Sequence, residues 1–145
     1  MKTLLLVLAA VFGSAHSANR WFSVQVRGTL LCHDQPYANQ PIDIFHASKQ
    51  MDYTDFMSHF TGKDGYFDLS AKLSTDDYMI SPYLVIRHRC WENPQVPHRC
   101  NRKIVLAVPH GNVTVAEVPT KLFDMGTVDL RFKHKSEVIV KCGVA

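Results

Sequence analysis

Short runs of alternating apolar and polar residues, separated by turn residues, recur along this chain. In FSVQVRGTLLC, the residues Phe22, Val24 and Val26 fall on one face at a period of two, and Gly28 interrupts the alternation as a β-bulge would. PIDIFH, PYLVIRHRC, RKIVLAVP and GTVDLRFK are further runs of this kind, and EVIVKC is a possible extra strand. Short strands at such regular spacing predict an all-β fold, an antiparallel β-sandwich of seven to eight strands.

Two segments between these runs carry local signals of their own. FMSHFTGKDGYFDLS predicts a hairpin with its turn at Lys63-Asp64-Gly65, because Asp-Gly supplies the positive backbone angles that a tight turn needs. The stretch from Ala47 to Phe56 is a weak helix candidate that lacks two clear turns of apolar periodicity. The alternating apolar residues should face inward and form the core. They are Val24, Val26, Leu30, Ile44, Phe67, Leu69, Leu84, Ile86, Ile104, Leu106, Val128 and Leu130.

The first residues indicate the compartment. Lys2, an apolar run from Leu4 to Phe12 and small residues before a cut after Ser17 have the build of a secretory signal peptide over residues 1–17. The apolar run is too short to span a bilayer, and no later segment is long and apolar enough to be a transmembrane segment. We therefore expect a secreted, extracellular protein whose residues 18–145 form a single domain.

The charge balance is only mildly basic. The chain has 16 Lys and Arg against 13 Asp and Glu, and one of the 16 is Lys2 in the predicted signal peptide. So small a surplus does not indicate a nucleic-acid partner. Asn112-Val113-Thr114 is an acceptor sequon, and Asn112 is therefore a candidate glycosylation site in a secreted protein.

The segment HRCWENPQVPHRC, residues 88–100, repeats the letters HRC around a proline-bearing loop. Its two histidines and two cysteines have the ligand types of tetrahedral zinc, and a Cys–His pair is also the core of nucleophilic catalysis. The third interpretation is a loop held by disulfides, with both histidines partly exposed beside them. An even number of cysteines in an oxidising compartment favours this interpretation, because two disulfides leave no thiolate. We therefore predict no metal, no cofactor and no catalytic residue. The four cysteines are Cys32, Cys90, Cys100 and Cys142.

The same loop is rich in cations. Glu92 is the single acidic residue between Arg87 and Lys103, and Trp91 lies among the cations. Cations concentrate anions, and an indole suits an interface, so these residues form a candidate surface for an anionic lipid head group or a sulfated glycan. An ordinary solvated end of the sandwich is the alternative. The predicted basic surface consists of Arg87, Arg89, Trp91, Arg99, Arg102 and Lys103.

Several of these segments resemble one known family in content, order and spacing. VRGTLLC, PIDIF, TGKDGYFDLS, ISPYLVIRHRC, a second cysteine just before NRKIVLAVP, and FDMGTVDL are similar to the nematode transthyretin-like proteins, from about Val26 to Leu130. The resemblance implies a transthyretin-like (prealbumin-like) β-sandwich and a small secreted protein of a family without a known catalytic centre. One member bridges phosphatidylserine on dying cells to a phagocyte receptor, and others have been discussed as secreted signalling or host-interaction proteins. Members commonly carry an acidic residue where this chain has Arg89.

The resemblance also implies a disulfide pairing, which the residues alone leave open. In a transthyretin-type sandwich the end of the first strand lies at the same pole as the two strand ends that flank the HRC loop. This favours Cys32 with Cys90, and it leaves Cys100 for Cys142. A local bridge between Cys90 and Cys100 is the main rival.

The leading expectation is a non-enzymatic extracellular interaction or signalling module, with an extracellular protein, a lipid head group or a glycan as its partner. The alternative is a carrier of a small apolar ligand in the channel of an oligomer, as in transthyretin. An enzyme of the hydroxyisourate hydrolase type, which shares the fold, is less expected. That enzyme relies on a first-strand histidine and a C-terminal Tyr-Arg-Gly-Ser, where this chain has WFSVQV and KCGVA.

Overall fold

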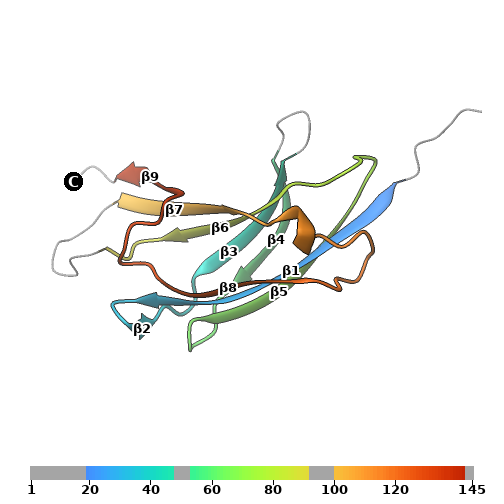
Figure 1. The fold of residues 1–145 in the computed structure, drawn as a ribbon. Coiled ribbons are helices and arrows are strands. Elements are labelled where there is room, and N and C mark those ends of the chain that lie inside the picture. Colours follow the sequence, from blue (N-terminus) through green and yellow to red (C-terminus); the bar gives the residue numbers. More distant parts are fainter. Residues whose placement is uncertain (1–18, 48–52, 92–99, 143–145) are drawn as a thin grey trace, which may run out of the picture.

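The computed structural model describes residues 19–47, 53–91 and 100–142, with the side chains of 53–56, 100, 141 and 142 left out. Within these ranges, nine strands form two sheets that lie as two layers (Figure 1). The first sheet holds β1 (Arg20–Cys32), β2 (Gln35–Pro36), β5 (Tyr66–Thr75) and β8 (Leu122–Asp129). The second holds β3 (Pro41–Ala47), β4 (Tyr53–Phe60), β6 (Pro82–His88), β7 (Cys100–Ala107) and β9 (Glu137–Cys142). The predicted β-sandwich is confirmed, and EVIVKC is a strand.

Strand β1 is the axis of the first sheet, because it is paired on both sides. β5 runs antiparallel to it and β8 runs parallel to it. The parallel pair differs from the antiparallel prediction, because β8 reaches β1 over a long connection rather than through a hairpin. The register of this pair shifts between Arg27 and Thr29, so Gly28 lies at a bulge, as its place in the sequence predicts.

The hairpin predicted around Lys63-Asp64-Gly65 is wrong in its pairing. The turn itself forms, since Gly65 has a φ of 75° and its N–H donates to the carbonyl of Gly62 at 3.0 Å. The strands on either side of the turn belong to different sheets, because β4 pairs with β3 and β5 pairs with β1. A turn signal is local, and it does not specify the partners of the strands beside it.

The helix candidate from Ala47 to Phe56 is also wrong where the structure describes it. Ala47 ends β3, and the chain is a strand again from Tyr53. Positions 48–52 lie outside the described residues. Helix in the described ranges is confined to the 3-10 turn η1 (His110–Asn112), and none of it has the length and apolar character needed to cross a membrane.

The core lies between the two sheets and follows the alternation of the sequence. All of the predicted core residues are buried except Leu106 and Val128, which are partly exposed and pack against the core. Three further large side chains, those of Phe22, Ile42 and Ile80, are fully buried in the same core. The second sheet is antiparallel throughout, in the order β4-β3-β6-β7-β9, so β9 forms one of its edges.

Candidate anion-binding pole

A disulfide closes one end of the sandwich. It joins Cys32, the last residue of β1, to Cys90, two residues beyond the end of β6, with the Cα atoms 5.8 Å apart. This bond links the two sheets, confirms the first predicted pairing and excludes the local bridge between Cys90 and Cys100. Ligand atoms of Cys32, His33 and Cys90 lie close together, but both sulfurs belong to the disulfide and offer no thiolate to a metal.

The second predicted pairing is supported by the backbone. Cys100 and Cys142 lie directly opposite each other at the ends of β7 and β9. Opposed residues of an antiparallel pair have Cα atoms about 4.5 to 5.5 Å apart, which is a separation that a disulfide can bridge. The side chains of both cysteines lie outside the described residues, so the bond itself stays a prediction.

Arg102 is buried, and this corrects its assignment to the predicted basic surface. The residue is 4% exposed. Its Nε donates to Oε1 of Glu137 on β9, and its Nη2 donates to Oε2 of the same carboxylate at 2.9 Å. Its Nη1 donates to the carbonyls of Cys90 at 2.6 Å and Leu130 at 3.2 Å. A cation held in this way fastens β9 and the segment after β8 to β7, and its charge is already neutralised.

His88 was expected to be partly exposed, and it too is buried. Its side chain has 0% exposure, and its Nε2 lies 3.8 Å from Oε2 of Glu137. Burial, followed by the charge of Arg102, lowers the pKa of His88 from 6.5 to about 4, although Glu137 opposes the shift. His88 is therefore neutral at physiological pH and adds no positive charge to the surface. His98 lies outside the described residues.

The structure divides the rest of the predicted basic surface between two faces. Arg87 and Lys103 are opposite each other on β6 and β7, and Arg89 donates from Nε to Oδ1 of Asn101 at 2.6 Å. These three cations lie on the outer face of the second sheet, since they alternate with inward-facing residues. Arg99 lies outside the described residues.

Trp91 lies away from those cations, next to the buried ion pair. The guanidinium carbon of Arg102 is 5.0 Å from the centroid of its ring, and the carbonyl of Trp91 is 2.6 Å from Nε2 of His33. Trp91 is therefore held at the disulfide-closed end through its ring by the second sheet and through its backbone by the turn that follows β1.

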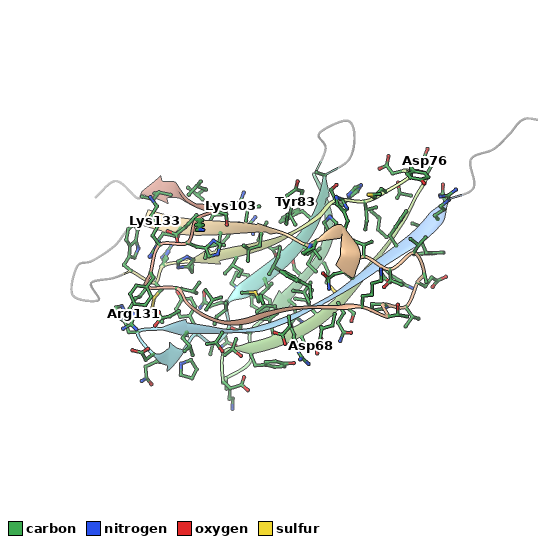
Figure 2. All side chains as sticks on the ribbon, viewed as in Figure 1. Asp68, Asp76, Tyr83, Lys103, Arg131 and Lys133 are labelled. Atoms are coloured by element: carbon green, nitrogen blue, oxygen red, sulfur yellow. A yellow bond between two sulfur atoms is a disulfide. The ribbon has the colours of Figure 1, made fainter. Side chains whose placement is uncertain are left out.

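A groove of about 470 Å³ opens beside Trp91 along β9. We call it the pole groove, and its accessible lining consists of Trp91, Arg131, Lys133, Val138 and Ile139. Figure 2 shows Arg131 and Lys133 at this end of the sandwich, on the segment that joins β8 to β9. Lys133 is exposed, whereas Arg131 is paired with Asp34 at 3.0 Å and with Asp129 at 3.1 Å. The sequence signal for this groove is the basic segment RFKHK, a pattern that favours a charged strand end over an extended cationic surface.

The candidate glycosylation site Asn112 lies at the end of η1 and is half-buried. Its Nδ2, the atom that would receive a glycan, donates to the carbonyl of Leu122 at 2.7 Å. Glycosylation at Asn112 stays a prediction.

Comparison with known proteins gives the family. Residues 27–109, from β1 to the residue before η1, match the Transthyretin-like family. The chain belongs to the transthyretin-like family. It is 30% identical over 147 residues to Transthyretin-like protein 46 of Caenorhabditis elegans, across 97% of this chain and 78% of that protein. It is 28% identical over 116 residues to Transthyretin-like protein 33 of the same organism, across 79% and 78% of the two chains.

Among solved structures, a 9R-lipoxygenase from Cyanothece overlaps 76% of this transthyretin-like chain and 17% of its own, with 13% identity and a TM-score of 0.43. This likeness carries no conclusion about function. The family resemblance expected from the sequence is confirmed by the match over residues 27–109 and by the two relatives.

Proposed function

We propose that this transthyretin-like protein is a secreted, non-enzymatic binding protein, and that its pole groove contacts the head groups of an anionic lipid surface. The signal-peptide pattern of residues 1–17 and the disulfide between Cys32 and Cys90 support an extracellular location, because disulfides persist in oxidising compartments.

One observation carries the choice of a lipid surface: a cation, an indole and a row of exposed apolar side chains lie together at the pole. Lys133 is exposed beside Trp91, and Phe132 is 58% exposed between the two cations of the groove. Val138 and Ile139 on β9 are 54% and 60% exposed. A lysine attracts anionic head groups, while aromatic and aliphatic side chains suit the layer beneath them. A sulfated glycan would match the charge, but it has no apolar layer for these side chains to enter.

The test is vesicle binding by the purified secreted chain. Phosphatidylcholine vesicles with and without phosphatidylserine should be compared at several salt concentrations. We expect binding to the anionic vesicles alone, weaker at high salt because the attraction is screened. Lys133→Glu should lower the affinity roughly thirtyfold, because each lysine near an anionic surface contributes about 1 kcal/mol and the substitution replaces this attraction with a repulsion of similar size.

Lys63→Glu is the matched control, because it makes the same change of charge at an exposed residue, on the turn between β4 and β5, that does not line the groove. Ile139→Asp tests the apolar contribution and should also weaken binding. Absence of binding at low salt, or equal losses in the Lys133 and Lys63 variants, would contradict the proposal. Binding to heparin without binding to anionic vesicles would show that the partner is a glycan, and it would overturn the lipid assignment.

A further inference from the structure

The outer face of the second sheet holds a groove that is more apolar than a solvated sheet face should be. It measures about 300 Å³, and its lining includes Phe45 of β3, Tyr83 and Val85 of β6, and Val105 of β7. In an antiparallel sandwich the outward positions of the strands are normally polar. Here Val85 is only 3% exposed, and the other three are half-buried although they face outward.

The strand register arranges these side chains in rows. Tyr83 is opposite Phe45 of β3, and Val85 is opposite Val105 of β7, so an apolar strip follows the sheet, with Asp43 beside Val85 on β3. The next row in the same direction is Arg87 opposite Lys103. From the row of Tyr83 to the row of Arg87 the strand advances four residues, or roughly 13 Å. Figure 2 shows Tyr83 and Lys103 on the side of the second sheet that faces away from the first.

The charges at this end of the groove do not balance. Arg87 is ion-paired with Asp43, whose carboxylate also accepts from Oγ of Ser58 at 2.6 Å. Lys103 takes part in none of the ion pairs formed by the described side chains. It stands directly opposite Arg87, and like charges in this position destabilise a strand pair. Asp43 offsets one of the two cations, and one positive charge remains at the end of an apolar strip.

We propose that this groove binds an amphiphile with one anionic head group and an alkyl tail. The tail lies along Phe45, Tyr83, Val85 and Val105, where it covers apolar surface, and the head group lies at Lys103. A carboxylate or a phosphate monoester supplies the charge, so a fatty acid and an alkyl phosphate share the required chemistry. The site shares no lining residue with the pole groove, although Val138 of the pole groove lies opposite Lys103 on β9.

The experiment is a titration of the purified chain with twelve-carbon probes below their micelle concentrations, followed by calorimetry. The probes are dodecanoate, dodecyl phosphate, dodecanol and dodecyltrimethylammonium. We expect saturable binding of the two anions, with weaker binding of the alcohol and none of the cation. The two anions compared with each other tell a carboxylate ligand from a phosphate ligand.

Lys103→Met should lower the affinity for both anions about tenfold and leave dodecanol unchanged, because the methionine keeps the apolar stem and removes the charge. It should not lower the melting temperature, since it also removes the repulsion with Arg87, and this separates lost binding from lost folding. Val105→Glu should lower the affinity for every probe that binds. Lys63→Met is the control with the same change of charge, and it should bind as the unaltered chain does.

Equal affinities for the anions, the alcohol and the cation would overturn the proposal, as would unchanged anion binding in Lys103→Met. If Lys133→Glu lowers anion binding as much as Lys103→Met does, the ligand belongs to the pole groove instead. Vesicle binding by the Lys103→Met variant remains an independent measurement of the pole groove, so each site can fail without the other.

Discussion

Arg102 and Glu137 form an ion pair that is almost completely closed to solvent, with side-chain exposures of 5% and 3%. The two residues are 35 positions apart and come from the neighbouring strands β7 and β9. The same guanidinium binds backbone carbonyls of Cys90 and Leu130, so a single side chain joins four segments at the closed pole. A buried charge of this kind depends on its partner, because neither ion can be solvated by water.

Removal of one partner of this pair should be strongly destabilising. For Glu137→Gln we expect the free energy of unfolding to fall by about 3 to 5 kcal/mol, because the charge of Arg102 is left buried without a counter-ion. Urea denaturation measures it. The free energy of unfolding should fall less in the double variant Arg102→Met with Glu137→Leu than in Glu137→Gln, because the double variant buries no charge. A loss below about 1 kcal/mol in Glu137→Gln would show that the carbonyls alone satisfy the arginine.

The buried His88 should make stability depend on pH in acid. Its pKa is about 4 in the folded chain and 6.5 in the unfolded chain, so the unfolded state binds the extra proton between these values. Stability contributed by the neutral imidazole is therefore complete above about pH 6.5 and falls as the pH approaches 4. Over that range the loss should be on the order of 3 kcal/mol.

Urea midpoints of the unaltered chain and of His88→Gln, measured from pH 7 to pH 4, give the contribution of His88 as a difference. That difference should shrink with falling pH. A difference that stays constant would mean that the imidazole takes up its proton at the same pH in both states. Arg102 and Glu137 face His88 from β7 and β9, and both are present in the two proteins being compared.

Both disulfides should be found by peptide mapping under non-reducing conditions. One linked peptide should contain Cys32 and Cys90, as the structure has them, and a second should contain Cys100 and Cys142. The double variant Cys32→Ser with Cys90→Ser should lose about 2 to 4 kcal/mol of stability, because the unfolded chain regains freedom. Two titratable thiols in the unreduced protein would disprove the bond between β7 and β9.

Two glycines with positive φ offer a matched comparison. Gly65 and Gly126 have φ values of 75° and 68°. A Cβ added to Gly126 meets nothing within 4 Å, whereas one added to Gly65 lies 2.3 Å from the carbonyl oxygen of Leu30. Gly126→Ala should therefore lower the free energy of unfolding by about 1 to 2 kcal/mol, from backbone strain alone. Gly65→Ala should lower the free energy of unfolding by roughly 1 to 3 kcal/mol more, because the backbone at Leu30 must move to make room for the Cβ. Equal melting temperatures in the two variants would contradict this account.

The strands and the core could be predicted from the sequence because alternation is a local property. Val24, Val26 and Ile86 are buried for the same reason that the pattern selects them. The turn at Gly65 is equally local, and it was found. The sheet to which each strand belongs is not local, and this is why β4 and β5 were wrongly joined in one hairpin and why the parallel pairing of β1 with β8 was missed.

In the candidate site, too, contacts between residues far apart in the sequence were the hardest to predict. Cys32 and Cys90 could be placed together through the family resemblance, and the structure has their bond. Arg102 could not be distinguished from the cations around it, because its burial depends on Glu137, which lies far along the chain. The two-residue turn from β1 to β2 was missed as well. His33 and Asp34 adopt φ values of 53° and 62° there without glycine, which the usual turn signal requires.

The position of β9 at the edge of its sheet has a consequence for the behaviour of the protein in solution. In the part of the chain that the structure describes, β9 pairs with β7 on one side and with no strand on the other. Val138, Ile139 and Val140 follow one another along this edge, each more than half exposed. Such a β-branched edge is a template for the addition of further strands. The ion pair between Arg102 and Glu137 keeps this strand fastened to β7, so one of its two edges stays covered while the other is open to a further chain.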